Sequence, residues 1–253
     1  MTIAEKLTTI AENEQRVYAA GYEKGYEEGE ASGGGAIWDG IQNGGTRTDY
    51  SSQFNNQYWT DETFNPKHSF AVASNGRAAY MFQHSKIVDG AYIHGDKLDF
   101  SNYRNLLSLF NASTVKRLKR IDARKAESGF NGMANMFLSC EQLETIEEFY
   151  PSTLTNFVST FIYCHNLTHC IFCSEIAVDG LNMQDCTKLD KASIISIFTN
   201  LQTPQPSGTI TLSKEAVDKA FETSPGANDG STAGNSEYWS LMQYTTGWTI
   251  KLV

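Results

Sequence analysis

A short pattern that recurs along the middle of this 253-residue chain constrains its fold more than any other feature. Four segments combine closely spaced apolar residues with a final phenylalanine, and these phenylalanines are Phe82, Phe110, Phe137 and Phe161. A small residue follows three positions later, and a fifth unit continues this column: Ser85, Ser113, Cys140, Cys164 and Cys186. The steps along this column are 28, 27, 24 and 22 residues. A period of about 20 to 29 residues is typical of a solenoid, in which each unit buries an apolar edge against its neighbours.

The residues within each unit predict its local structure. The apolar positions before each phenylalanine follow helical spacing and predict one or two turns of helix with a buried face. Beyond the small residue, apolar positions recur at a spacing of three, as in Val115, Leu118 and Ile121. The same spacing selects Leu143, Ile146 and Phe149 in the next unit and Leu167, Cys170 and Cys173 in the third. We predict a repeat core that contains Phe82, Phe110, Phe137, Phe161, Cys140, Cys164, Cys186, Leu143, Ile146 and Leu167.

Two of these units carry a resemblance to a known repeat family. The segments Phe137–Ile146 and Phe161–Cys170 resemble the phenylalanine, cysteine and leucine framework of BspA-like leucine-rich repeats. The resemblance covers roughly residues 78–190. It leads us to predict an α/β repeat solenoid, a short leucine-rich-repeat-like array of about four to five units that occupies residues 73–190.

The N-terminal segment, residues 1–31, is predicted to be a helix. Ile3, Leu7, Ile10 and Val17 follow one another at intervals of 4, 3 and 7, which is heptad spacing. These residues could build a coiled-coil stalk or anchor and make the chain a homo-oligomer. Two heptads are short for a coiled coil, so a helix docked on its own domain is the alternative.

The remaining segments are predicted to flank the repeats. Residues 32–72 form a linker and an aromatic-rich N-terminal cap, although exposed aromatic residues there could also bind carbohydrate. Residues 191–253 form an α/β C-terminal cap, because the last unit of a repeat array needs a covering element that differs from the repeats. Within this cap we predict helices over residues 192–201 and 214–221 and strands over residues 209–212 and 248–253.

A second resemblance covers most of the chain. It rests on the segments Ala20–Gly25, Ile37–Asp39, Gly45–Tyr50, Trp59–Phe64 and Thr246–Ile250. Together they are similar to repeat proteins encoded by phages and prophages of gut Gram-positive bacteria, often beside tail genes. The resemblance implies a virion-associated structural or host-surface-binding role, with other virion proteins or a host-surface protein or glycan as partners. The first alternative is a bacterial cell-surface adhesin that binds a protein or a glycan, which a signal peptide or wall anchor would favour. The second, which we favour less, is a glycan-acting enzyme, which would need a cleft with two converging carboxylates.

Composition and charge narrow the classes of partner. Hydrophobic residues make up 40% of the chain, which is enough for a core. The formal charge of −9 makes nucleic acid and anionic membranes poor electrostatic partners. No apolar stretch approaches the ~18 residues of a membrane span, and the N-terminus lacks the features of a secretory signal. We therefore expect neither nucleic-acid binding nor membrane insertion, and we expect the five cysteines to be reduced thiols.

No motif in the sequence predicts chemistry. Phosphate-binding loops, nucleophile elbows and the usual zinc-protease pattern are absent. The cluster Cys164, His165, His169, Cys170 and Cys173 has the donor atoms of a zinc or redox site, but the repeat register predicts that its cysteines are small core residues. We therefore predict a non-enzymatic protein with no catalytic, cofactor-binding or metal-binding residues.

Overall fold

The computed structural model describes the repeat region and most of the C-terminal region. The described residues are 49–52, 54–56, 58–59, 75–87, 92–93, 100–202, 208–221 and 236–253. The predicted helix at 1–31, with Ile3, Leu7, Ile10 and Val17, lies outside them, and so does most of the predicted cap at 32–72. The stalk and its role in oligomerisation therefore stay predictions.

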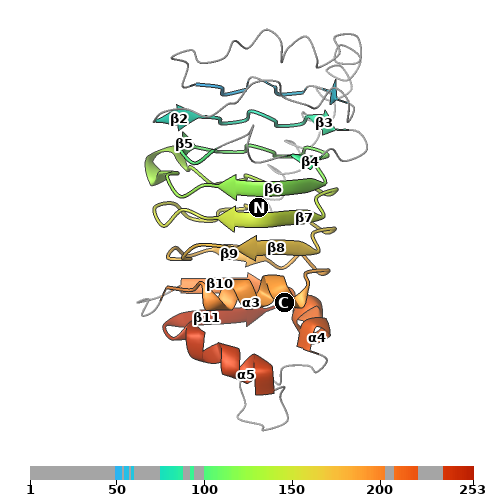
Figure 1. Cartoon of the computed structure of the whole chain (residues 1–253), viewed down its shortest axis with the longest axis vertical. Helices are drawn as coiled ribbons and strands as arrows, with labels where there is room; N and C mark the ends of the chain where they lie inside the picture. Colours follow the sequence, from blue (N-terminus) through green and yellow to red (C-terminus); the bar gives the residue numbers. More distant parts are fainter. Residues whose placement is uncertain are drawn as a thin grey trace, which may run out of the picture.

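The strands of the described residues lie one after another along the long axis of the molecule, as Figure 1 shows. All the described strand pairs are parallel. Two sheets have two strands each: β1 (Tyr58–Trp59) with β3 (Lys86–Ile87), and β2 (Gly76–Arg77) with β5 (Tyr103–Asn105). The four-stranded sheet has the order β4 (Tyr92–Ile93), β6 (Arg117–Asp122), β7 (Thr145–Tyr150), β8 (His169–Phe172). The last sheet has the order β11 (Trp248–Leu252), β10 (Gly208–Leu212), β9 (Leu181–Met183).

The described α-helices belong to the C-terminal region. They are α3 (Lys191–Thr199), α4 (Lys214–Phe221) and α5 (Ser236–Met242). Short 3-10 turns, η2 (Ser128–Phe130) and η3 (Gln243–Thr245), complete the set. The bounds of α3, α4, β10 and β11 agree closely with the elements predicted for this region, whereas α5 was not predicted.

The predicted fold class, an α/β repeat solenoid formed by a leucine-rich-repeat-like array, is wrong. The described strands form four separate small sheets, where such an array would have one continuous sheet. The described residues between 75 and 190 also contain no α-helix, although the sequence predicted helical turns in every unit.

The segments around the phenylalanines are successive tight turns, and this explains why the helix prediction fails. Ser108 and Ala112 flank Phe110 and have φ angles of 53° and 54°, which an α-helix cannot contain. The N–H groups of Ser108, Phe110 and Ala112 donate to carbonyls of the following unit at 2.8 to 2.9 Å. The N–H groups between them close turns within the unit, such as Leu109 to the carbonyl of Leu106 at 3.2 Å. Half of the backbone N–H groups in this segment therefore donate to carbonyls of the next unit, and they are not available for the hydrogen bonds of a helix.

Buried phenylalanine rings form the centre of the stack. Neighbouring rings are stacked with centroids 5.2 to 6.0 Å apart, in the order Phe54, Phe82, Phe110, Phe137 and Phe161. Every residue predicted for the repeat core is fully buried. Phe54 is an additional member that the sequence analysis missed, although it lies 28 positions before Phe82, the same step as the next unit. The rings hold successive units at a fixed spacing.

The strand register departs from the predicted columns at one position. Ile146 pairs with Cys170, as the spacing predicts. The register then shifts, so that Phe149 pairs with Phe172 and not with Cys173. Phe172 is therefore the buried residue of the third unit, and Cys173 is only partly buried.

Candidate functional site

The exposed face of strands β6 and β7 gathers charged side chains in register. Leu118 and Ile121 of β6 point into the core, whereas Lys119 and Arg120 are exposed. On β7, Glu147 is exposed and Glu148 is partly exposed. Since Leu118 pairs with Ile146 and Arg120 with Glu148, Lys119 and Arg120 lie opposite the acids Glu147 and Glu148, whereas Arg117 lies opposite Thr145.

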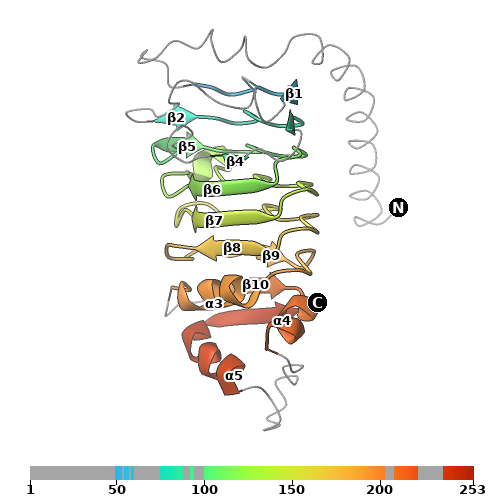
Figure 2. The same cartoon turned by 45° about the vertical axis from the view of Figure 1, so that its right-hand side comes forward.

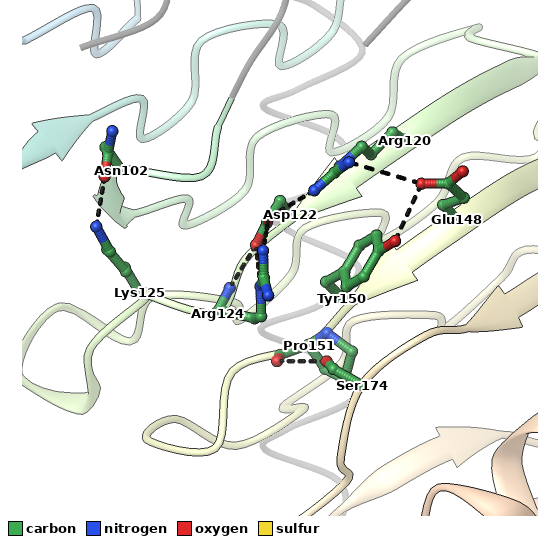
Figure 3. Close-up of polar contacts among 9 residues, drawn as sticks. All are labelled: Asn102, Arg120, Asp122, Arg124, Lys125, Glu148, Tyr150, Pro151 and Ser174. Atoms are coloured by element: carbon green, nitrogen blue, oxygen red, sulfur yellow. Dashed lines mark hydrogen bonds and ion pairs between the residues drawn. The ribbon is translucent and has the colours of Figure 1, made fainter. Parts of the chain in front are cut away.

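A buried carboxylate lies at the end of this face (Figure 3). Asp122 is 3% exposed and binds two guanidinium groups. Arg124 donates from Nε to Oδ1 at 2.9 Å and from Nη2 to Oδ2 at 2.6 Å, and Arg120 donates from Nη2 to Oδ2 at 3.1 Å. Burial alone would raise the pKa of Asp122, but the hydrogen bonds from Arg124 and Arg120 outweigh it and hold the pKa below its ordinary value. Asp122 is therefore a charged anchor for both arginines.

Tyr150 completes this cluster from the neighbouring strand. The guanidinium carbons of Arg120 and Arg124 lie 4.6 and 4.9 Å from the centre of its ring, which is cation–π distance. Its hydroxyl donates to Oε2 of Glu148 at 3.2 Å, as Figure 3 shows. Burial and the neighbouring Glu148 raise the pKa of Tyr150. The cluster is held in one geometry by contacts between two strands, and its charges balance.

Helix α3 covers the edge of the four-stranded sheet next to β8 (Figure 2). Backbone N–H groups of Cys170 and Phe172 donate to the hydroxyl oxygens of Ser193 and Ser196 at 2.8 and 3.0 Å. Serine side chains thus take the place of the carbonyls that another strand would supply, and the edge is closed to further strand pairing.

The start of α3 is fixed to β8 by a second set of polar contacts. Asp190 caps the helix by accepting from the backbone N–H of Ser193 at 2.8 Å. His169 of β8 lies 2.7 Å from the same carboxylate through Nδ1. Burial would raise the pKa of Asp190, but the hydrogen bonds from Ser193 and His169 outweigh it and lower the pKa. This shifted carboxylate therefore joins α3 to β8.

The cysteines of the small-residue column have a structural partner in each unit. The thiol of Cys140 donates to the carbonyl of Phe110 at 2.9 Å, and the thiol of Cys164 donates to that of Phe137 at 3.1 Å. Cys186 makes the same contact with Phe161 at 3.8 Å. Burial raises the pKa of Cys140 to about 12 and raises those of Cys164, Cys170 and Cys186 well above the ordinary value. Small residues with a donor suit this column because they fill little space and bind a buried carbonyl.

The structure does not bring the donor atoms of the Cys164–Cys173 segment together as a binding site. Cys164 and Cys170 are buried in the core, whereas His165 is exposed and His169 binds Asp190. Among the described residues, no group of three or more His, Cys, Asp or Glu side chains could hold a metal ion. No helix of the described residues is long and apolar enough to cross a membrane.

These environments predict how the thiols react in the native protein. Cys173 is partly buried, and its raised pKa is caused mainly by that burial. We expect a thiol reagent to modify Cys173 first at about pH 8, while the four buried thiols react only as the chain unfolds, because they are inaccessible and protonated. Peptide mass spectrometry during a labelling time course identifies the site. Fast modification of Cys140 or Cys164 under native conditions would contradict the structure.

The described part of the chain is therefore a stack of short parallel strands with a charged outer face between β4 and β8, closed by α3. Comparison with protein-family models, with curated proteins and with solved structures found no match to this chain.

Proposed function

We propose that this chain is a non-enzymatic structural or host-surface-binding protein of a phage virion, associated with the tail. The observation that carries the proposal is the charged face of β6 and β7, which the buried phenylalanine stack holds rigid. A fixed, extended face of this kind suits a large partner better than a small substrate, because it presents many weak polar contacts at once. Other virion proteins, or a host-surface protein or glycan, are the proposed partners.

The roles of the shifted carboxylates support a role in binding over one in catalysis. Asp122 binds Arg120 and Arg124, and Asp190 caps α3 while contacting His169. Both have pKa values below the ordinary value, whereas a general acid or base that works near neutral pH needs a carboxylate whose pKa is raised. Asp122 is accounted for by holding the two arginines, and Asp190 by joining α3 to β8.

The resemblance to phage and prophage repeat proteins supports the location. It rests on short segments near both ends of the chain, including Gly45–Tyr50 and Thr246–Ile250. The alternative location is the surface of the bacterium, where the chain would act as an adhesin for a protein or a glycan.

The test is to find where the full chain resides. Virions from an induced lysogen that carries the coding sequence are purified, and their proteins are measured by mass spectrometry and by immunogold labelling. We expect the chain in intact virions, with label on the tail. Its presence in the cell-wall fraction together with its absence from virions would contradict the proposal and favour the adhesin.

A further inference from the structure

The charged face of β6 and β7 is complementary to itself. Two basic positions on β6 have an acidic position 28 residues later on β7: Lys119 lies opposite Glu147 and Arg120 lies opposite Glu148, whereas Arg117 lies opposite Thr145. The next strand, β8, presents the uncharged Ile171 between Cys170 and Phe172, where the register with β7 shifts. The face therefore has one basic row and one acidic row side by side.

Lys119 and Glu147 are available for contacts with another molecule. Both side chains are exposed, and neither forms an ion pair within the described residues. Arg120 and Glu148 make only a long contact of 3.9 Å, with side-chain exposures of 43% and 42%. Arg120 is also bound to Asp122, and Glu148 accepts from Tyr150, so Lys119 and Glu147 are the charges of this face that remain to attract a partner. An exposed pair across neighbouring strands contributes little energy, so their proximity within one chain does not prevent this.

We propose that this face binds a second copy of the chain. The two copies are related by a two-fold axis that lies in the interface, parallel to the strands and midway between β6 and β7. This operation places the basic row of each copy over the acidic row of the other and leaves the register along the strands unchanged. Lys119 of one copy then faces Glu147 of the other, and the symmetry makes this contact twice.

The pattern of charge favours a second copy over an unrelated partner. A surface with one sign of charge would be repelled by one of the two rows, since the rows are only about 4.8 Å apart, the spacing of neighbouring strands. A complementary surface must repeat both rows at that spacing, and this chain already has such a surface. A two-fold axis across the strands is excluded because it would place the basic row over the other basic row.

The inference deepens the proposed function and rests on its premise that the β6–β7 face contacts a macromolecule. The contact area of one small sheet is modest, so we expect a weak dimer, with a dissociation constant on the order of 10–100 µM, that salt weakens. Self-association is measured on the purified protein, whereas the virion location is measured in phage particles. Failure of the proposed dimer can therefore be distinguished from failure of the proposed virion location.

The test uses two charge-reversed full chains, Lys119→Glu and Glu147→Lys. Each variant alone should bring like charges together at both symmetric contacts and raise the dissociation constant about tenfold or more. An equimolar mixture should recover association, because the acid introduced at position 119 of one chain then faces the base introduced at position 147 of the other. Sedimentation equilibrium measures the three masses, and Lys219→Glu, an exposed change on α4, is the matched control that should behave as the parent.

A carbodiimide, which joins an amine directly to a carboxylate, makes the test independent of association elsewhere, including through residues 1–31. In the mixture, one variant has acids at both positions and the other has lysines at both. Any cross-link between positions 119 and 147 must therefore join two copies. We expect to detect this cross-link by mass spectrometry. Its yield should fall at 0.5 M salt, because the Debye length is then roughly 4 Å and the charges are screened. Its absence from the mixture overturns the proposal, whatever the masses.

Discussion

Replacing Phe137 by alanine is expected to lower the free energy of unfolding by about 3–5 kcal/mol. The ring is fully buried and stacks on Phe110 on one side and on Phe161 on the other, and its edge contacts Phe149. Neighbouring backbone segments are tied by hydrogen bonds between units, so they cannot close the cavity without losing those bonds. Urea unfolding followed by circular dichroism measures the change.

Two further variants show whether the loss comes from the stack. Phe137→Leu keeps much of the volume and should cost about 1–2 kcal/mol. Val158→Ala removes an exposed side chain and should change the free energy of unfolding by less than about 0.5 kcal/mol. A Phe137→Ala variant that loses less than about 1 kcal/mol would show that the ring is not part of a tightly packed core.

The sequence was informative about which residues are buried and at what steps they recur. The small residues recur at steps close to those that separate paired positions on neighbouring strands. Leu118, Ile146 and Cys170 are in register, as their spacing predicts. This succeeds because a buried position in a stack must be apolar or small whatever the local backbone does. Burial can therefore be predicted even where the backbone conformation is not.

The conformation of the phenylalanine segments could not be predicted in the same way. A run of tight turns buries residues at nearly the same intervals as a helix, so the spacing alone does not separate the two. What separates them is the positive φ at alternate turns, as at Asn135 and Ser139. Asparagine favours such a conformation and serine adopts it less readily, but Tyr80 and Ala112 occupy equivalent places and give no such signal.

The sites that join strands were missed for a different reason. Asp122 is buried because Arg124 turns back over it and because Tyr150, 28 residues later, brings its ring beneath the guanidinium groups. The register shift that exchanges Cys173 for Phe172 likewise depends on the neighbouring strand. Such features depend on contacts between units, so the periodicity of one chain segment does not predict them.

Asp122→Asn is expected to destabilise the protein by about 1–3 kcal/mol at pH 7, because the amide keeps the shape but not the charge that binds Arg120 and Arg124. The pKa of Asp122 is lower in the folded protein than in the unfolded chain, so its charge stabilises the fold above roughly pH 4, and this contribution is lost as the pH falls through the folded pKa. The difference in unfolding free energy between parent and variant should therefore be largest near neutral pH and shrink toward pH 2. Urea unfolding at several pH values measures it, with Glu141→Gln, a change at an exposed acid outside this cluster, as a control that should matter little. A difference that stays constant from pH 7 to pH 2 would mean that the charge of Asp122 does not stabilise the fold.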